Sequence, residues 1–221
     1  MKQIYTLGIV ILSAGLYACS SDDDIGRIVI GNGNTMFSLN ELQYQDPYVI
    51  QVTDVDGNPQ ANTTVKIRLR STLYNKGAYG KTGEGWAPFY TIINCPAEDL
   101  NNNGNLDAGE DTNGNGTLEP TNPATVANHP ILTPTLTPGS NSITTDESGF
   151  GYFSITYPKS EANWSSVLIT ATATFSGSEN IATKTQSLPA LLADLEDEEI
   201  LPLGGDGNSP YGLVGDCANP N

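Results

Sequence analysis

The chain of 221 residues has few basic side chains: nine Lys and Arg stand against 25 Asp and Glu, which gives a formal net charge of −16. Removal of residues 1–18, whose one charged side chain is Lys2, takes the net charge to −17. Such an excess of negative charge disfavours binding to the phosphates of nucleic acids and to anionic lipid headgroups. Nucleic acids and anionic membrane surfaces are therefore excluded as electrostatic partners.

The sequence also has a single His, His129, and no Gly-rich phosphate-binding loop. A Ser-His-Asp arrangement or a His-based metal site would depend on this one residue, which lies between Asn128 and Pro130. Nothing in the sequence marks a pair of carboxylates for glycoside hydrolysis. We therefore expect a non-enzymatic protein in which His129 is an exposed loop residue.

The N-terminus has the pattern of an export signal. Lys2 precedes an apolar run, residues 4–18, that is too short to span a bilayer comfortably. The segment ending in Leu16-Tyr17-Ala18-Cys19 resembles a bacterial lipobox, and that resemblance implies a lipoprotein signal peptide over 1–18 and a lipid on Cys19. Because Ser20 follows, the resemblance implies anchoring in the outer membrane of a Gram-negative cell, at its periplasmic side or at the cell surface. The alternative is an ordinary secretory signal. Residues 19–43 are predicted to be a flexible tether.

Cysteine is scarce, with three residues in all, and Cys19 accounts for one of them. The remaining pair, Cys95 and Cys217, would be exported to an oxidising compartment, which favours a disulfide. Two free thiols or a metal-ligating pair are the alternatives. A bridge would close a long loop, for which chain entropy predicts a stabilisation of roughly 4–5 kcal/mol.

Residues 99–110 fit the calcium-loop pattern D-x-[DN]-x-[DN]-G-x5-E at every specified position. Side-chain oxygens occupy positions 1, 3 and 5, Gly104 permits the sharp turn at position 6, and position 12 is a carboxylate that can bind in a bidentate manner. Position 7 would contribute its main-chain carbonyl, and position 9 a direct or water-mediated contact. The expected calcium ligands are Asp99, Asn101, Asn103, Asn105, Asp107 and Glu110.

A second loop, residues 111–122, follows without a gap and repeats the pattern up to position 9. Its expected ligands are Asp111, Asn113, Asn115, Thr117 and Glu119. Its position 12 is Asn122, which lacks a carboxylate, so we expect a weaker site or one that borrows an oxygen from elsewhere, for example from Glu110. The alternative is an Asn/Gly-rich disordered linker.

The two loops abut, which leaves no room for the flanking helices of an EF-hand. They resemble EF-hand loops without the flanking helices, and in this respect they are more similar to thrombospondin type 3 repeats than to EF-hands. We therefore expect calcium to order a segment that could not fold unaided, rather than to operate a sensor.

Outside these loops, alternating apolar and polar residues predict strands at 47–53, 63–70, 153–157, 167–175 and 181–187. Short, Thr-rich strands separated by turns indicate a β-sandwich. The best candidate for a helix is 189–199, which opens with Pro189 and places Leu191, Leu192 and Leu195 on one face.

Residues 48–65, 145–157 and 167–173 look like the opening and closing strands of bacterial Ig-like domains of the intimin/invasin type. The run 157–164, together with the tandem loops after Cys95, resembles exported Ig-like proteins of Gram-negative bacteria. The resemblance covers 44–188, with 94–140 as a long insertion and 189–221 as a C-terminal extension. It implies an all-β, Ig-like antiparallel sandwich with an extracellular structural role or a role in cell adhesion.

A recognition module is the alternative function. Trp86, Tyr79 and Tyr90 could form an exposed aromatic platform for a cell-surface protein or a polysaccharide. The competing explanation is that these rings fill the core or lie under the insertion.

Overall fold

The computed structural model describes residues 26–33, 35–175, 177–201 and 206–221, so the predicted signal peptide and Cys19 lie outside the described residues. Ten strands and two 3₁₀ turns make up its regular structure. Their bounds are β1 (Arg27–Asn32), β2 (Phe37–Ser38), β3 (Gln43–Thr53), β4 (Thr64–Lys81), β5 (Trp86–Pro96), β6 (Thr125–Asn128), β7 (Ser142–Thr144), β8 (Phe150–Pro158), η1 (Lys159–Glu161), β9 (Ser165–Phe175), β10 (Ser178–Ser187) and η2 (Leu192–Asp194).

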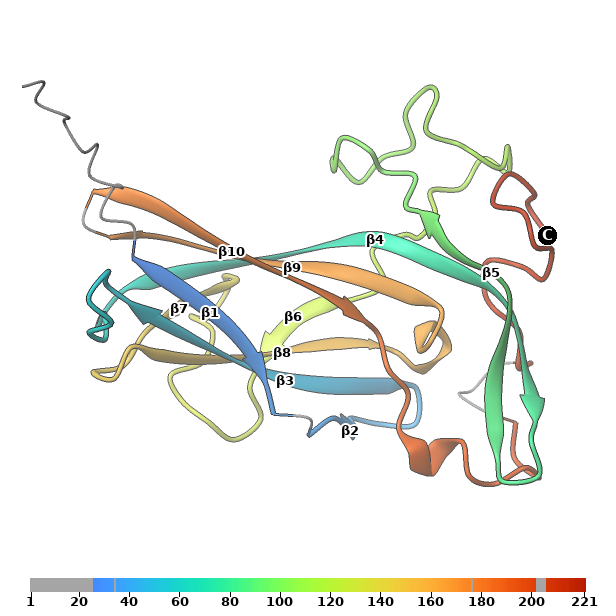
Figure 1. The fold of residues 1–221 in the computed structure, drawn as a ribbon, viewed down its shortest axis with the longest axis horizontal. Coiled ribbons are helices and arrows are strands. Elements are labelled where there is room, and N and C mark those ends of the chain that lie inside the picture. The colour runs from blue at the N-terminus through green and yellow to red at the C-terminus, as the bar shows by residue number, and fades with distance from the viewer. Residues whose placement is uncertain (1–25, 34, 176, 202–205) are drawn as a thin grey trace, which may run out of the picture.

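The strands form two antiparallel sheets that pack face to face (Figure 1). One sheet has the order β1-β3-β8-β6, with β2 beside β3. The other has the order β10-β9-β4-β5, with β7 also pairing with β4. The predicted all-β sandwich is confirmed, and the five predicted strands fall on β3, β4, β8, β9 and β10.

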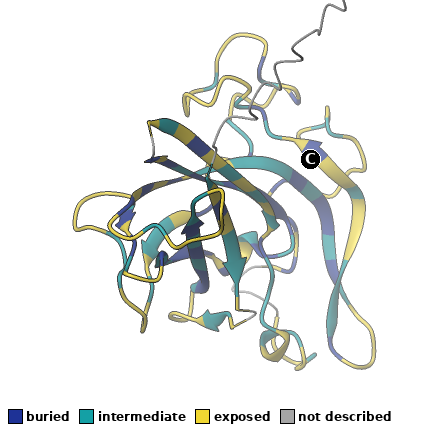
Figure 2. Cartoon of the chain, turned by 60° about the vertical axis from the view of Figure 1, so that its left-hand side comes forward, coloured by how far each residue is buried: buried dark blue, intermediate teal, exposed yellow. Residues whose placement is uncertain are grey.

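The core lies between the sheets because every second side chain of each long strand points inward. On β4, Val65 and Ile67 are fully buried, while the residues between them are exposed. From the facing sheet, Tyr48 of β3 stacks on Phe153 of β8 with ring centroids 5.3 Å apart. Figure 2 shows buried residues concentrated inside the sandwich and exposed residues in the loops. Each fully buried aliphatic or aromatic side chain contributes about 1.5–3 kcal/mol.

Two boundaries differ from the prediction. The segment predicted as tether contains β1, which pairs with β3 from Arg27 opposite Thr53 to Asn32 opposite Tyr48. Ile28 is buried there, so the apolar residues that precede the Gly/Asn-rich stretch join the sheet. The predicted insertion also shrinks, because β6 pairs with β8 at the edge of the first sheet. The irregular part is residues 97–124.

The helix predicted at 189–199 is wrong, since only the 3₁₀ turn η2 forms there. Beyond that turn, the segment hydrogen-bonds to the β4–β5 hairpin. The Leu195 carbonyl accepts the Trp86 N–H at 2.7 Å. The Glu198 carboxylate accepts N–H groups from Thr82, Gly83 and Gly85 at the hairpin turn.

Candidate metal centre

The segment 97–124 projects from the end of β5 and returns at β6, over the outer side of β4 (Figure 1). Its base is held by backbone hydrogen bonds, from Ala97 N–H to the Thr72 carbonyl at 2.9 Å and from Glu98 N–H to the Glu119 carbonyl at 2.8 Å. The predicted disulfide between Cys95 and Cys217 is present, with its Cα atoms 5.5 Å apart. The C-terminal segment is therefore tied covalently to the base of the insertion.

The first loop is organised by carboxylates that accept backbone N–H groups. Asp99 accepts Asn103 N–H at 3.0 Å and Gly104 N–H at 2.9 Å, and Gly104 has φ +77°. A residue with a Cβ is disfavoured at that φ, which explains the glycine at position 6. Asn101 and Asn103 direct their side-chain amides at Asp107, with N···O distances of 2.8 and 2.7 Å.

The second loop repeats this arrangement twelve residues later. Asp111 accepts Asn115 N–H at 3.1 Å and Gly116 N–H at 2.9 Å. Asn113 and Asn115 donate their amides to the Glu119 carboxylate at 2.6 and 2.8 Å. The repeat extends to position 7, where Asn105 N–H and Thr117 N–H each donate to the Asn side chain at position 5 at 2.7 Å. The two segments thus fold as copies of one loop.

The second loop is completed by Glu98, a residue that the sequence reasoning missed. In the first loop Glu110 accepts the N–H groups of position 2 at 3.0 Å and of position 9 at 2.9 Å. In the second loop Glu98 accepts the corresponding N–H groups, from Thr112 at 2.9 Å and Glu119 at 3.0 Å. Glu98 therefore takes the place of the carboxylate that Asn122 lacks. Glu110, the residue expected to be shared, uses both carboxylate oxygens to accept N–H groups of the first loop.

The two closing carboxylates are buried, with Glu98 1% and Glu110 6% exposed, and Asn113 of the second loop is buried as well. Burial raises the pKa of Glu98, and backbone N–H groups of the second loop oppose that shift. Beneath them, burial and the nearby charges of Glu119 and Glu98 raise the pKa of Tyr74 to about 12. Negative charge is thus concentrated at the base of the loops, where a bound cation would neutralise it.

The residues fit a hard cation by the chemistry of their donors. No three His, Cys, Asp or Glu side chains form a metal-binding group within the described ranges. Each loop instead mixes carboxylates with Asn amides and a main-chain carbonyl, an all-oxygen donor set of the kind that Ca²⁺ takes. An amide oxygen has two lone pairs, so accepting one backbone N–H leaves the other available for a cation.

The predicted aromatic platform does not form, because its three rings do not share an exposed surface. Tyr79 is buried, its ring lies 5.3 Å from that of Trp164, and its hydroxyl donates to the Ala162 carbonyl at 3.1 Å. Trp86 is half-buried and donates its indole N–H to the Asp197 carbonyl at 3.0 Å. Tyr90 is exposed but sets its ring edge against Trp164.

His129 is half-buried rather than exposed, and burial lowers its pKa. Its Nδ1 accepts backbone N–H groups from Ile131 and Leu132 at 3.2 and 2.9 Å, and its ring packs against that of Tyr152. Within the described residues, its side chain makes no hydrogen bond to a Ser or to a carboxylate. The imidazole therefore caps a turn.

The fold and the loops define an antiparallel β-sandwich with a tandem-loop insertion. Comparison of the chain with protein-family models, curated proteins and solved structures found no match. Among the residues that the structure describes, no helix is long and apolar enough to cross a membrane. The functional argument therefore depends on the chain's own residues.

Proposed function

We propose that this chain is a non-enzymatic, calcium-stabilised Ig-like lipoprotein of the bacterial cell envelope, with a structural or adhesive role. The observation that supports it best is the repeated loop: two segments twelve residues apart share one hydrogen-bond pattern, and each is closed by a buried glutamate. A linker without a ligand has no physical reason to retain two such copies.

In this proposal each loop holds one Ca²⁺ through oxygen ligands. The first loop uses its six predicted ligands, and the second uses its five together with Glu98. The calcium ions would supply positive charge among six carboxylates, those of Glu98, Asp99, Asp107, Glu110, Asp111 and Glu119. The Asp and Asn side chains orient the backbone turns, and a metal ion bound by their oxygens would hold the segment in that conformation.

The test is the thermal unfolding of the mature domain with calcium and with a chelator. A ligand that binds only the folded form stabilises it by mass action, by about 2.7 kcal/mol at 100 times its dissociation constant. For two independent sites we expect roughly twice that figure. An unfolding midpoint that is identical in calcium and in chelator, with no calcium copurifying, would contradict the proposal.

The lipid anchor is tested separately from the calcium sites. Radiolabelled palmitate should be incorporated by the wild-type chain and not by Cys19→Ser, because the lipid is attached through that thiol. Outer-membrane fractionation of the two forms shows whether anchoring follows lipidation. A variant that stays unlabelled yet fractionates like the wild type would remove the anchor from the proposal.

A further inference from the structure

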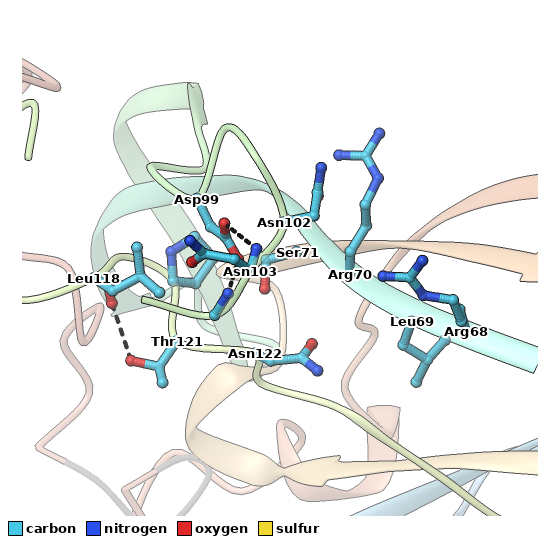
Figure 3. A pocket seen from close by; sticks show the side chains of 12 residues that line it. Arg68, Leu69, Arg70, Ser71, Asp99, Asn102, Asn103, Leu118, Thr121 and Asn122 are labelled. Carbon is cyan, nitrogen blue, oxygen red and sulfur yellow. Dashed lines mark hydrogen bonds between the residues drawn. The ribbon is translucent and has the colours of Figure 1, made fainter. Parts of the chain in front are cut away.

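Three cations stand in a row on the outer face of β4. Lys66, Arg68 and Arg70 occupy alternate positions of the strand and are exposed. Side chains at such positions share one face and are separated by about 6.6 Å along the strand. In Figure 3 the side chains of Arg68 and Arg70 extend away from β4. These three residues are a third of the nine Lys and Arg in the chain.

Within the part of the chain that the structure describes, no salt bridge joins this row, Lys66-Arg68-Arg70, to an acidic side chain, although Glu179 and Asp99 line the hollows beside it. The one salt bridge among the described residues joins Lys159 to Asp194, on another part of the fold. The chain has 25 Asp and Glu, so an acidic neighbour would be readily available if the row served only to hold the fold together. An array of unpaired cations on a strongly acidic protein points to an anion from outside.

Hollows lie at both ends of the row. One, of about 290 Å³, lies between β4 and the insertion and is lined by Arg68, Arg70, Asn102, Thr121 and Asn122 (Figure 3). The other, of about 560 Å³, includes Lys66 together with the polar groups of Asn62, Thr63, Thr64, Thr172 and Glu179. On β9, Thr170 and Thr172 stand directly opposite Arg68 and Lys66. The surface along the row is lined by guanidinium, ammonium, hydroxyl and amide groups, with the carboxylates of Glu179 and Asp99 in the two hollows.

We propose that this row and its flanking hollows bind an acidic polysaccharide, one that carries uronic-acid carboxylates. Arginine matches a carboxylate with two parallel hydrogen bonds. Thr and Asn side chains both donate and accept, as sugar hydroxyls require. The carboxylates of a uronic-acid polymer recur along its length, as the cations do along the strand.

Other polyanions suit this surface less well. A duplex nucleic acid carries one negative charge per about 1.7 Å of its axis, a much denser array than cations spaced about 6.6 Å apart along a strand. An acidic peptide needs either a free strand edge or apolar pockets for anchor side chains. β4 is paired with β9 along the whole row and with β7 at Thr64–Lys66, and the hollow at Lys66 offers no large apolar side chain.

The site is coupled to the insertion, and this step depends on the proposed calcium binding. Asp99, the first ligand of the first loop, lines the same hollow as Arg68 and Arg70. Without a cation its carboxylate repels an anionic ligand, and with calcium bound its charge is compensated. Saccharide and calcium should therefore strengthen each other's binding by the same factor.

The experiment is titration calorimetry of the folded mature domain with hexasaccharides of three uronic-acid polymers: galacturonate, mannuronate and hyaluronan. Carboxyl-reduced hexasaccharides are the matched ligands, and free calcium is held constant. We expect binding of at least one acidic hexasaccharide, at least tenfold weaker binding of its reduced form, and at least tenfold weaker binding by R68Q/R70Q. The charge-matched control R27Q/K81Q removes two exposed cations elsewhere and should bind like the wild type.

The proposal is overturned if the wild type binds none of the acidic hexasaccharides, if reduction has no effect, or if both double variants bind equally. Equal binding of a glutamate hexapeptide would assign the surface to acidic polypeptides and overturn it too. Calcium titrated without saccharide reports separately on the metal sites. Saccharide binding that persists when no calcium binds would refute the metal sites and the coupling while leaving the cationic row in place.

Discussion

Glu98→Gln tests the most specific feature of the loops, a glutamate that closes a loop lying after it in the sequence. The carboxylate is 1% exposed and accepts two backbone N–H groups, from Thr112 and Glu119. A glutamine can accept one of them but presents its NH₂ group to the other. Since a hydrogen bond to a charged group contributes about 1.5–3 kcal/mol, we expect a loss of that order without calcium.

Calcium adds a second, separable loss. At free calcium 100 times the dissociation constant, abolishing one site removes about 2.7 kcal/mol of stabilisation. For a domain of this size, 1 kcal/mol shifts the midpoint by about 2–4 °C, so the calcium-dependent part of the shift should fall by roughly 5–11 °C. Glu110→Gln should produce the same change through the first loop. Asn122→Ala should produce little change, because Glu98, and not Asn122 at position 12, closes the second loop.

The assay combines thermal unfolding, in calcium and in chelator, with the calcium stoichiometry of the folded protein. We expect two ions in the wild type and in Asn122→Ala, and one in Glu98→Gln and in Glu110→Gln. The reasoning fails if Glu98→Gln keeps both ions at unchanged affinity. It fails equally if Asn122→Ala loses one.

Three further predictions concern the scaffold. Replacing Cys95 and Cys217 by Ala should lower the free energy of unfolding by about 5 kcal/mol, the chain-entropy value for their separation of 122 residues; denaturant unfolding that matches the wild type would contradict this. Burial alone would raise the pKa of Asp194, but the hydrogen bonds from Lys159 and Tyr44 and the charge of Lys159 outweigh it, and the folded-state pKa is lowered. The stabilisation from this pair is therefore present above about pH 4. It is lost as pH falls through the folded pKa, and Asp194→Asn should flatten that part of the stability profile, which denaturant midpoints between pH 2 and 6 would measure. Gly77→Ala should destabilise by more than 1 kcal/mol, because Gly77 has φ +144° and a Cβ there would collide with the Phe89 carbonyl; an unchanged melting midpoint would count against it.

The sandwich was predictable where burial alternates along a strand. Val65 and Ile67 are buried between exposed cations, and the sequence of β4 displays that alternation directly. β5 carries no such signal: it is a largely exposed edge strand with Pro88 inside it. It is a strand because β4 pairs with it and residues after Leu195 cover its hairpin, contacts that no local pattern encodes. Residues 189–199 were wrongly predicted as a helix because their contacts with this hairpin likewise leave no pattern in the local sequence.

The candidate metal site was also predictable only in part. Ligands within one loop follow from the spacing, because a twelve-residue loop brings its own positions together. Glu98 was missed because the motif places the closing glutamate at the end of its loop, whereas here it precedes both. A signal was available: Glu98 lies twelve residues before Glu110, at the same phase of the repeat. Its role depends on the start and the end of the insertion meeting, where Glu98 N–H donates to the Glu119 carbonyl.

The position of Glu98 also gives the disulfide a local purpose. Cys95 lies three residues before Glu98, and Ala97 between them is hydrogen-bonded to Thr72 of β4. The bridge to Cys217 and this backbone bond fix the short segment that carries the Glu98 carboxylate. The first loop is closed from within by Glu110 and needs no such support. The second loop is closed by Glu98, which lies outside the loop. Its conformation therefore depends on β4, β5 and the C-terminal segment that Cys217 joins to Cys95. An insertion built in this way keeps its orientation relative to the outer face of β4, where the cationic row lies.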